Sequence, residues 1–318
     1  MMKGDVFVVM ELKNIFPNLY DYYQHLNRRK IISEIEKMKA GGEEEYPRLL
    51  AEKYFLATGR LLDWNNLSTY CEKMQWAKLY DLDDRKTLLS DKFLVRDWIA
   101  KKIGDKYLIP LLGVWNTFDE IDFDELPSQF VLKTNHASGF NLIVNDKSKI
   151  KRRQVKRLFD DWMDIDFSLY MGFEMQYSNI ERKIIAEKYI QTIDGDLPDY
   201  KFLCFDGTPF FCWVDKGRYE NHTRNIYDMN WSLQPWRQAN KKIYEKPIEK
   251  PVGFDQMRDL AATLSKGFSH VRVDFYNVEG RIFFGEMTFS NGCGFDLIYP
   301  EEANLMLGNL WKLDGLDK

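Results

Sequence analysis

The stretch His270–Gly292, HVRVDFYNVEGRIFFGEMTFSNG, is the most informative part of the sequence. In its first half, apolar residues alternate with polar or charged ones. A turn at Val278–Gly280 follows, and then the run RIFFGEMTF. A period of two that is interrupted by a glycine-containing turn is typical of a β-hairpin. The pattern therefore predicts two paired strands.

The expected register follows from the length of the turn. A three-residue loop whose glycine is left-handed is a common hairpin closure, and it would pair Asn277 with Arg281 and set Arg272 opposite Glu286. A two-residue loop would shift the register by one and move Glu286 to the other face. With the three-residue loop, one face carries four polar side chains, namely Arg272, Asp274, Glu286 and Thr288.

Two carboxylates and a guanidinium on one sheet face allow two interpretations. The first is a magnesium site, because this ion typically binds through one or two carboxylates together with substrate phosphates. The second is an internal ion pair between Arg272 and Glu286, with Asp274 at its rim. The hairpin alone leaves both open.

The composition excludes several classes of protein. The chain has 318 residues, enough for two or three subdomains, and a formal net charge of −4 with both signs interspersed, so we expect no nucleic-acid partner. No apolar run approaches the roughly 20 residues of a transmembrane helix. The four cysteines are scattered without metal-ligand spacing, which suits a reducing cytosol. We expect a soluble, cytoplasmic protein without a transmembrane segment.

The hydrophobic pattern changes along the chain and predicts an α+β fold. Residues 1–90 are expected to be a helical N-terminal region, with helices near 46–58 and 68–79, and residues 91–126 a linking helix and strand. From residue 127 strands and short helices dominate, with boundaries at 127–195 and 196–318. The Asp206-Gly207 pair predicts a tight hairpin between Tyr200–Phe205 and Thr208–Val214. Residues 215–250 show little periodicity.

A predicted buried strand ends in Lys133 and is followed by the small-residue loop Asn135–Gly139. A lysine beside a loop with exposed amides is what a polyphosphate requires, namely a point charge and backbone donors. The alternative is an ordinary hairpin whose lysine reaches toward solvent. His136 in this loop could donate to a phosphate, or it could cap the loop.

Three further features admit both a functional and a structural interpretation. Lys92 lies in the first turn of a predicted helix, where the helix dipole favours anions, which hints at another partner. Glu187–Ile190 ends a strand, and it could meet an adenine and a ribose or be a plain edge strand. Lys201 opens the next strand, where a salt bridge is the alternative. A basic and aromatic patch that could bind a carboxylated acceptor, or be a solvated loop, comprises Trp213, Asp215, Lys216, Arg218 and Arg224.

The order of these features resembles the ATP-grasp superfamily and, more closely, the TupA-like (teichuronopeptide biosynthesis) ATP-grasp family. The resemblance covers about Ser68 to Phe295. It rests on the segments YCEKMQWAKLYD, LLSDKFLVRDWIAKKIG, YLIPLLGVW, LPSQFVLKTNHASGFN, DYKFLCFDGTPFF and RVDFYNVEGRIFFGEMTFSNGCGF. It implies an ATP-grasp fold in which two α+β subdomains, here 127–195 and 196–318, enclose ATP.

The resemblance also implies roles for individual residues. ATP would be bound by Lys92, Lys133, Asn135, His136, Ser138, Gly139, Glu187, Lys188, Tyr189, Ile190 and Lys201. Asp274 and Glu286 would bind Mg²⁺, with two ions expected, and Arg272 and Lys201 would be catalytic. Many ATP-grasp enzymes have Asn two residues after the bridging Glu, whereas this chain has Thr288. The second ion would therefore rest more on phosphate and water, or on Asn291.

The implied activity is an ADP-forming carboxylate–amine ligase that works through an acyl phosphate. The resemblance suggests a uronic-acid carboxylate of a surface polysaccharide or its precursor, joined to an amino acid or amine, with the 213–237 stretch as the acceptor site. One alternative is a glycosyltransferase of the same pathway, for which Asp81-Leu82-Asp83 has the spelling of a metal motif. The other is a non-catalytic nucleotide-binding scaffold.

Overall fold

The computed structural model describes residues 17–190, 192, 197–217, 222–238, 241–244 and 248–313, with side chains from residue 24 onward. The N-terminal part is helical, as the sequence predicts. Its helices are α2 Pro17–Gly41, α3 Tyr46–Thr58, α4 Tyr70–Tyr80, α5 Asp84–Ser90 and α6 Val95–Ile103. Short 3₁₀ turns lie at η1 Glu43–Glu45, η2 Asp105–Tyr107, η3 Phe118–Glu120 and η4 Lys147–Lys149.

Local capping explains where these helices begin. A capping box starts α4, because the Thr69 hydroxyl accepts from the Glu72 backbone N–H and the Glu72 carboxylate accepts from that of Thr69. Helix α5 was not predicted, and its cap is Asp83, which accepts from the Arg85 N–H. Asp91 accepts from two backbone N–H groups of the turn before α6, so this helix begins four residues later than expected.

The first sheet is small and antiparallel, in the order β1-β4-β2-β3. Its strands are β1 Leu111–Trp115, β2 Phe130–Thr134, β3 Asn141–Val144 and β4 Ile184–Lys188. Helix α7 (Arg152–Asp164) packs on it through Phe159, which contacts the cluster around Phe130 and Ile184, and α8 (Phe167–Tyr170) follows. Strand β1, expected in the linking region, is thus part of this sheet.

The second sheet has five antiparallel strands in the order β10-β9-β5-β6-β7. They are β5 Asp199–Phe205, β6 Thr208–Lys216, β7 Thr223–Asp228, β9 His270–Val278 and β10 Arg281–Thr288. Helix α9 (Phe254–Ser265) covers one face, and α4 and α10 (Glu301–Leu310) pack against the other. The two-residue strands β8 (Arg237–Gln238) and β11 (Ile298–Tyr299) pair with each other.

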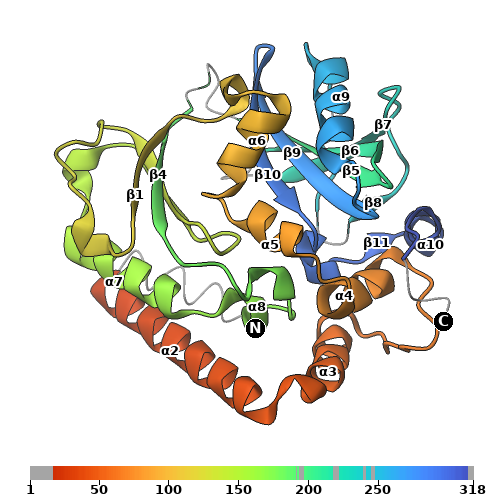
Figure 1. Ribbon diagram of the computed structural model, residues 1–318, viewed down its shortest axis with the longest axis horizontal. Coiled ribbons are helices and arrows are strands. Elements are labelled where there is room, and N and C mark those ends of the chain that lie inside the picture. The colour runs from red at the N-terminus through yellow and green to blue at the C-terminus, as the bar shows by residue number, and fades with distance from the viewer. Residues whose placement is uncertain are drawn as a thin grey trace.

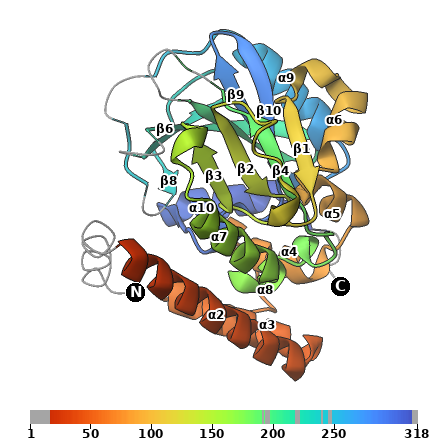
Figure 2. The same ribbon diagram turned by 90° about the vertical axis from the view of Figure 1, so that its left-hand side faces the viewer.

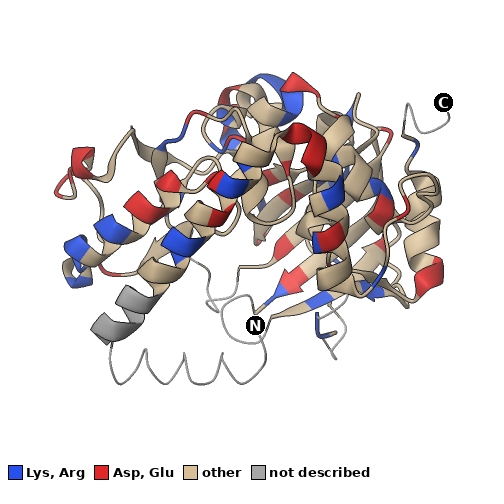
Figure 3. Cartoon of the chain, turned by 90° about the horizontal axis from the view of Figure 1, so that it is seen from below, with Lys and Arg blue, Asp and Glu red and all other residues tan. Residues whose placement is uncertain are grey.

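The two sheets lie side by side with α5 and α6 between them (Figure 1). Helix α2 runs along α7 and α8, beside the small sheet, as the turned view shows (Figure 2). Asp161 of α7 fixes α2 in place, because its buried carboxylate accepts from Arg28 at 2.7 Å and lies 2.8 Å from the His25 ring. Residues of both charge signs lie along the helices seen from below (Figure 3), in agreement with the interspersed charge of the sequence.

The hairpin of β9 and β10 closes in a way that differs from the prediction. Arg281 pairs with Val278, so the loop has two residues, Glu279 and Gly280, both left-handed with φ of 53° and 87°. The expected three-residue loop was therefore wrong. A β-bulge between Phe284 and Glu286 adds one residue to β10, so that the side chains after it point to the faces that were predicted.

The consequence is that the four polar side chains share one face, as predicted, but in a different register. Glu286 pairs with Asp274 and Thr288 with Arg272. The extra residue is Gly285, and a Cβ there would lie 3.1 Å from the carbonyl oxygen of Asp274. Glycine is required because the two backbones approach closely at the bulge.

We predict that Gly285→Ala destabilises the protein by about 1–3 kcal/mol, because the new methyl group meets backbone that cannot easily move. Chemical denaturation measures the effect. The matched control is Gly41→Ala at the end of α2, where a Cβ has its nearest neighbour at 3.9 Å. Equal stability of the Gly285 variant and the wild type would contradict this role of the bulge.

Candidate functional site

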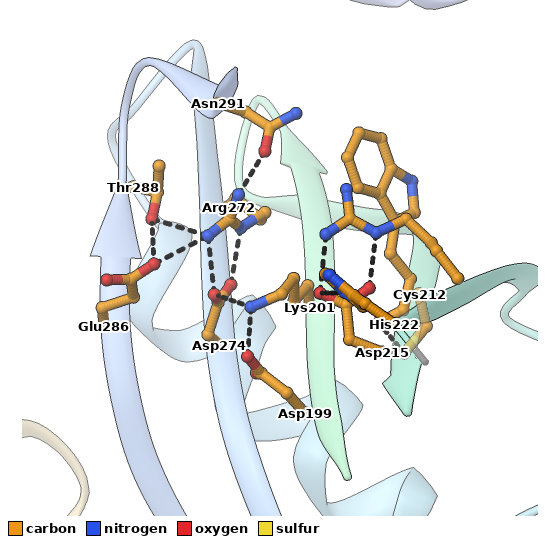
Figure 4. A network of polar contacts seen from close by, with 12 residues as sticks. Asp199, Lys201, Cys212, Asp215, His222, Arg272, Asp274, Glu286, Thr288 and Asn291 are labelled. Atoms are coloured by element: carbon orange, nitrogen blue, oxygen red, sulfur yellow. Dashed lines mark hydrogen bonds and ion pairs between the residues drawn. The ribbon is translucent and has the colours of Figure 1, made fainter. Parts of the chain in front are cut away.

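Arg272 forms the centre of a largely buried polar network on one face of the five-stranded sheet (Figure 4). Its Nε and Nη2 donate to the two carboxylate oxygens of Asp274, each at 2.7 Å. Nη2 also donates to Glu286 at 2.7 Å and to Thr288 at 3.0 Å, and Nη1 donates to the side-chain oxygen Oδ1 of Asn291. One guanidinium therefore fixes the positions of two carboxylates, a hydroxyl and an amide.

Lys201 extends this network from the neighbouring strand β5. It pairs with Asp274 in the ladder, and its ammonium donates to Asp274 Oδ2 at 2.7 Å and to Asp199. Burial raises the pKa of the Asp274 carboxyl, and Arg272 and Lys201 oppose that shift. Burial alone would lower the pKa of Arg272, but the facing carboxylates outweigh it and raise this pKa. Arg272, Lys201 and Asp274 thus favour one another's charged forms, although burial disfavours them.

The small sheet contributes a second group of charges. Lys133 on β2 lies 2.5 Å from a carboxylate oxygen of Glu187 on β4, whose other oxygen accepts from Arg96 at 3.1 Å. Arg96 is a residue that the sequence analysis missed. Its position four residues after Lys92 was the available signal. Lys92 donates to the Ala137 carbonyl in the loop after β2, and burial lowers its pKa.

These residues line two adjoining cavities between the sheets. The larger, of about 390 Å³, is bordered by Lys133, Glu187–Ile190 and Tyr276. The narrower, of about 70 Å³, shares Lys133, Glu187 and Tyr276 with it. The expected residues that line the narrow one come from both sheets and from the loop before α6, namely Lys92, Lys133, Ser138, Gly139, Glu187, Asp274 and Glu286. The structure therefore brings these residues together around one cleft, and Arg96 lies with them.

Other expected residues lie behind the cleft. Asn135 is fully buried, and its amide donates to the Glu181 carbonyl at 2.8 Å and accepts from the Lys183 N–H at 2.7 Å, so it ties the loop to β4. His136 is buried with its ring beside Phe140, and burial lowers its pKa to about 4. Both side chains face the protein rather than the cavities that the described residues enclose.

The expected acceptor patch is not an open surface. Trp213 is 0% exposed and packs in the core beneath β5–β7. Arg224 is also buried: it pairs with both oxygens of Asp215, and its guanidinium stacks 4.8 Å from the Trp213 ring. Lys216 lies over the Tyr244 ring, and Arg218 lies outside the described residues. The same residue types suit an exposed patch and a buried ion pair, and Asp215 and Arg224 form the latter.

The Asp81-Leu82-Asp83 stretch has a structural role. Asp81 pairs with Lys86 at 2.6 Å, and Asp83 caps α5 and pairs with Arg85 at 2.6 Å. Both carboxylates stabilise the start of α5, which favours a helix cap over a glycosyltransferase metal motif.

The residues at the cleft include donors for phosphate and ligands for magnesium, but the two carboxylates are not equally available to an ion. Lys92, Arg96 and Lys133 offer cationic donors for phosphate oxygens. Glu286 is partly exposed to the cleft, whereas Asp274 is held by two cations. The side-chain oxygen Oδ1 of Asn291 accepts from Arg272 and so is not presented to an ion. Among the described residues, no cluster of three or more Asp, Glu, His or Cys side chains forms a ready metal site.

A search of solved structures found distant similarities to three ligases, among others. Over 70% of its length, the chain is similar to a D-alanine–D-alanine ligase from Bacillus anthracis complexed with ATP, with 17% identity and a TM-score of 0.41, and it spans 63% of that protein. The corresponding Helicobacter pylori ligase matches 76% of this chain and 68% of its own length, at 14% identity and a TM-score of 0.37. The ATP-grasp ligase PsnB, complexed with minimal precursor, Mg and ADP, matches 73% of this chain and 59% of its own length, at 11% identity and a TM-score of 0.39. These similarities are too distant to align individual residues.

A search of curated proteins found no match. None of the described helices combines the length and apolar character that a membrane span requires. The expected α+β ATP-grasp fold, preceded by a helical N-terminal region, is confirmed. A model of the TupA-like ATPgrasp family matches residues 72–312, most of the sequence, and the chain therefore belongs to the TupA-like ATPgrasp family.

Proposed function

We propose that the protein is an ATP-dependent carboxylate–amine ligase that forms ADP, phosphate and an amide. The observation that carries this proposal is that cations of the small sheet and α6 line the same narrow cavity as Asp274 and Glu286 of the five-stranded sheet. Such an arrangement positions a triphosphate and a carboxylate between opposite walls, and positioning is the main requirement of phosphoryl transfer.

We propose one orientation for the nucleotide in the two cavities. The larger cavity, beside Glu187–Ile190 and Tyr276, takes the base and the ribose. The narrower one takes the phosphates, which Lys92, Arg96 and Lys133 neutralise. Lys133 and Arg96 share Glu187 as a partner, so a phosphate would compete with that carboxylate for both. The exposed backbone of Ser138 and Gly139 adds N–H donors at this end.

The residues of the hairpin stabilise charge where the substrate carboxylate reacts. An oxygen of the substrate carboxylate attacks the terminal phosphorus, ADP leaves, and an amine then attacks the acyl carbon and expels phosphate. Arg272 is held rigidly by its partners, so it offsets the negative charge that develops on the acyl oxygen. Glu286 and Asp274 would hold magnesium, which when bound would neutralise charge on the phosphate oxygens. Lys201 keeps Asp274 oriented from behind.

The substrate class is a finer proposal, which the family resemblance supports. We propose a uronic-acid carboxylate of a surface polysaccharide or its precursor as the activated group, an amino acid or amine as the nucleophile, and the cytoplasm as the place of action. The test is phosphate release from ATP that requires both a uronate-containing acceptor and one member of an amine panel. If no amine in the panel supports phosphate release, or if the protein turns over a sugar nucleotide instead, the proposal is overturned.

We predict that Glu286→Gln lowers the rate of ADP formation by about 100-fold or more while the fold is kept, because the neutral amide lacks the negative charge that a carboxylate offers to magnesium. A coupled ADP assay measures the rate and circular dichroism checks the fold. Glu279→Gln, at the exposed turn of the same hairpin, is the matched control. Near-normal turnover of the Glu286 variant would remove this residue from the metal site.

We predict that Lys133→Met raises the KM for ATP about 10-fold or more, because a charged donor to phosphate is lost. Glu187 keeps Arg96 as a partner in this variant, so the small sheet is expected to stay folded. Steady-state kinetics and direct titration with nucleotide measure the change. Lys149→Met, on the solvent-exposed η4 turn, is the control. An unchanged nucleotide affinity of the Lys133 variant would place this lysine outside the site.

A further inference from the structure

Tyr177 lines the narrow cavity of the cleft, and the nucleotide site assigns it no role. It is the last residue of the 3₁₀ turn η5 (Met175–Tyr177), which precedes β4, and its side chain is half-buried. Tyr276 lines both cavities, whereas Tyr177 and Glu286 line the narrow one alone. Tyr177 therefore borders the part of the cleft that the phosphates and the reacting carboxylate would occupy.

The charges at the hairpin act on the Tyr177 hydroxyl. Burial and the carboxylates of Glu174 and Glu286 raise the pKa of this hydroxyl well above its ordinary value, and the charge of Arg272 opposes the rise. The ring packs edge-to-face on Phe167, with the ring centroids 5.0 Å apart. The hydroxyl therefore stays protonated at neutral pH, and the cleft has a neutral hydrogen-bond donor on a fixed ring.

Hydrogen bonds attach η5 to the chain that follows β10. Glu174, directly before η5, accepts from the Ser290 hydroxyl and, at 3.1 Å, from the Cys293 thiol. Gln176 donates to the Ser290 hydroxyl at 2.6 Å. The Tyr177 backbone N–H donates to the Glu174 carbonyl at 3.0 Å and closes the turn. Because residues before and within η5 are held in this way, Tyr177 keeps its position relative to the hairpin.

The two segments that meet here are strained and partly charged. Phe173, directly before Glu174, and Cys293 are both left-handed, with φ of 57° and 55°. Such backbone is unfavourable for residues other than glycine, and it is found mostly at functional sites. Glu174 is 5% exposed, and burial raises the pKa of its carboxyl, although the hydrogen bond from Ser290 opposes the shift. A strained attachment around a buried carboxylate indicates that the position of η5 matters for function.

We propose that Tyr177 is a further catalytic residue whose hydroxyl donates a hydrogen bond to the substrate carboxylate, and that Glu174 is its positioning residue. This inference rests on the proposed ligase function. The hydrogen bond goes to the carboxylate oxygen that is not phosphorylated, which becomes negatively charged when the nucleophile attacks the acyl carbon. Tyr177 from η5 and Arg272 from β9 are then two donors, on different segments, to the same developing charge.

Hydroxylamine in place of the amine tests this role. Its nitrogen attacks the acyl carbon of the acyl phosphate, the C–O bond breaks, and phosphate leaves with the bonding pair and takes up a proton from the nitrogen. The product is a hydroxamate, which ferric ions reveal by colour. The assay contains ATP, magnesium and a uronate-containing oligosaccharide, each of which is varied separately.

We expect Tyr177→Phe to lower kcat for hydroxamate formation about 100-fold, because one of the two donors to the developing charge is lost. The KM for ATP and the magnesium requirement are expected to stay unchanged, as is the unfolding midpoint, since only one oxygen is removed. Tyr170→Phe is the matched control. Tyr170 contacts the same Phe167 ring and is not among the described residues that line the cleft.

A double-mutant cycle tests the positioning role of Glu174. We expect Glu174→Gln to lower kcat about 10-fold with an unchanged KM for ATP, and Glu174→Asp to recover part of the loss. Because Glu174 acts through Tyr177, the double variant is expected to be no slower than Tyr177→Phe alone. If the two losses multiply instead, Glu174 does not act through Tyr177, and its positioning role is wrong.

The remaining outcomes separate this inference from the ligase function. If the wild type forms hydroxamate and Tyr177→Phe keeps its kcat, the inference fails while the ligase function stands. A raised magnesium requirement with a normal kcat at saturating magnesium also contradicts it, because the hydroxyl then supports Glu286 rather than the substrate. If the wild type forms no hydroxamate with any carboxylate of a panel, the ligase proposal itself fails, and this inference fails with it.

Discussion

The buried guanidinium of Arg272 is the constraint on which the arrangement of the five-stranded sheet depends. A buried charge is costly unless it is paired and hydrogen-bonded, and Arg272 has partners on β9, on β10 and in the turn η6 (Asn291–Gly294) after it. These partners belong together only if β10 presents Glu286 and Thr288 to the same side as Asp274. The strand register, the bulge and the path of the chain after β10 therefore follow from one side chain that has to be satisfied from all sides.

The hairpin shows what a sequence can and cannot predict. Alternation identified both strands, because a period of two is visible without knowledge of the partner. The loop length was not predictable, since Val278, Glu279 and Gly280 suit two closures and a left-handed Glu279 is not a turn preference. The shorter loop shifts the pairing of β10 by one residue, and the bulge shifts it by one residue again. Together they return Glu286 and Thr288 to the face that carries Asp274. The shared face was therefore predicted correctly from a register that was wrong. By contrast, Asp206-Gly207 predicted its turn correctly, because both positions favour positive φ.

The site was predictable to the extent that its residues interrupt an apolar strand. Lys133 and Glu187 stand out because a charge at the end of a buried strand needs an explanation, and the structure places both at the cleft. The burial of Arg224 was not predictable because β7, which carries it and pairs it with Asp215 of β6, lies in a region without periodicity. Arg96 was missed because an arginine on an amphipathic helix is usually a solvated residue. Burial of polar groups, rather than residue type, separates these cases, and burial depends on contacts between distant segments.

The charges of the cleft indicate how metal and nucleotide depend on each other. Asp274 is already neutralised by Arg272 and Lys201, so it offers an ion less than an unpaired carboxylate would. Glu286 lies 2.7 Å from Arg272, and its side chain is 36% exposed. Since magnesium usually completes its shell with substrate phosphates and water, a site with one well-presented carboxylate holds the ion chiefly when phosphates are present. In the proposed site, Lys133 of the small sheet and the cations at α6 would bind those phosphates, and the hairpin carboxylates would hold magnesium chiefly while the phosphates are bound.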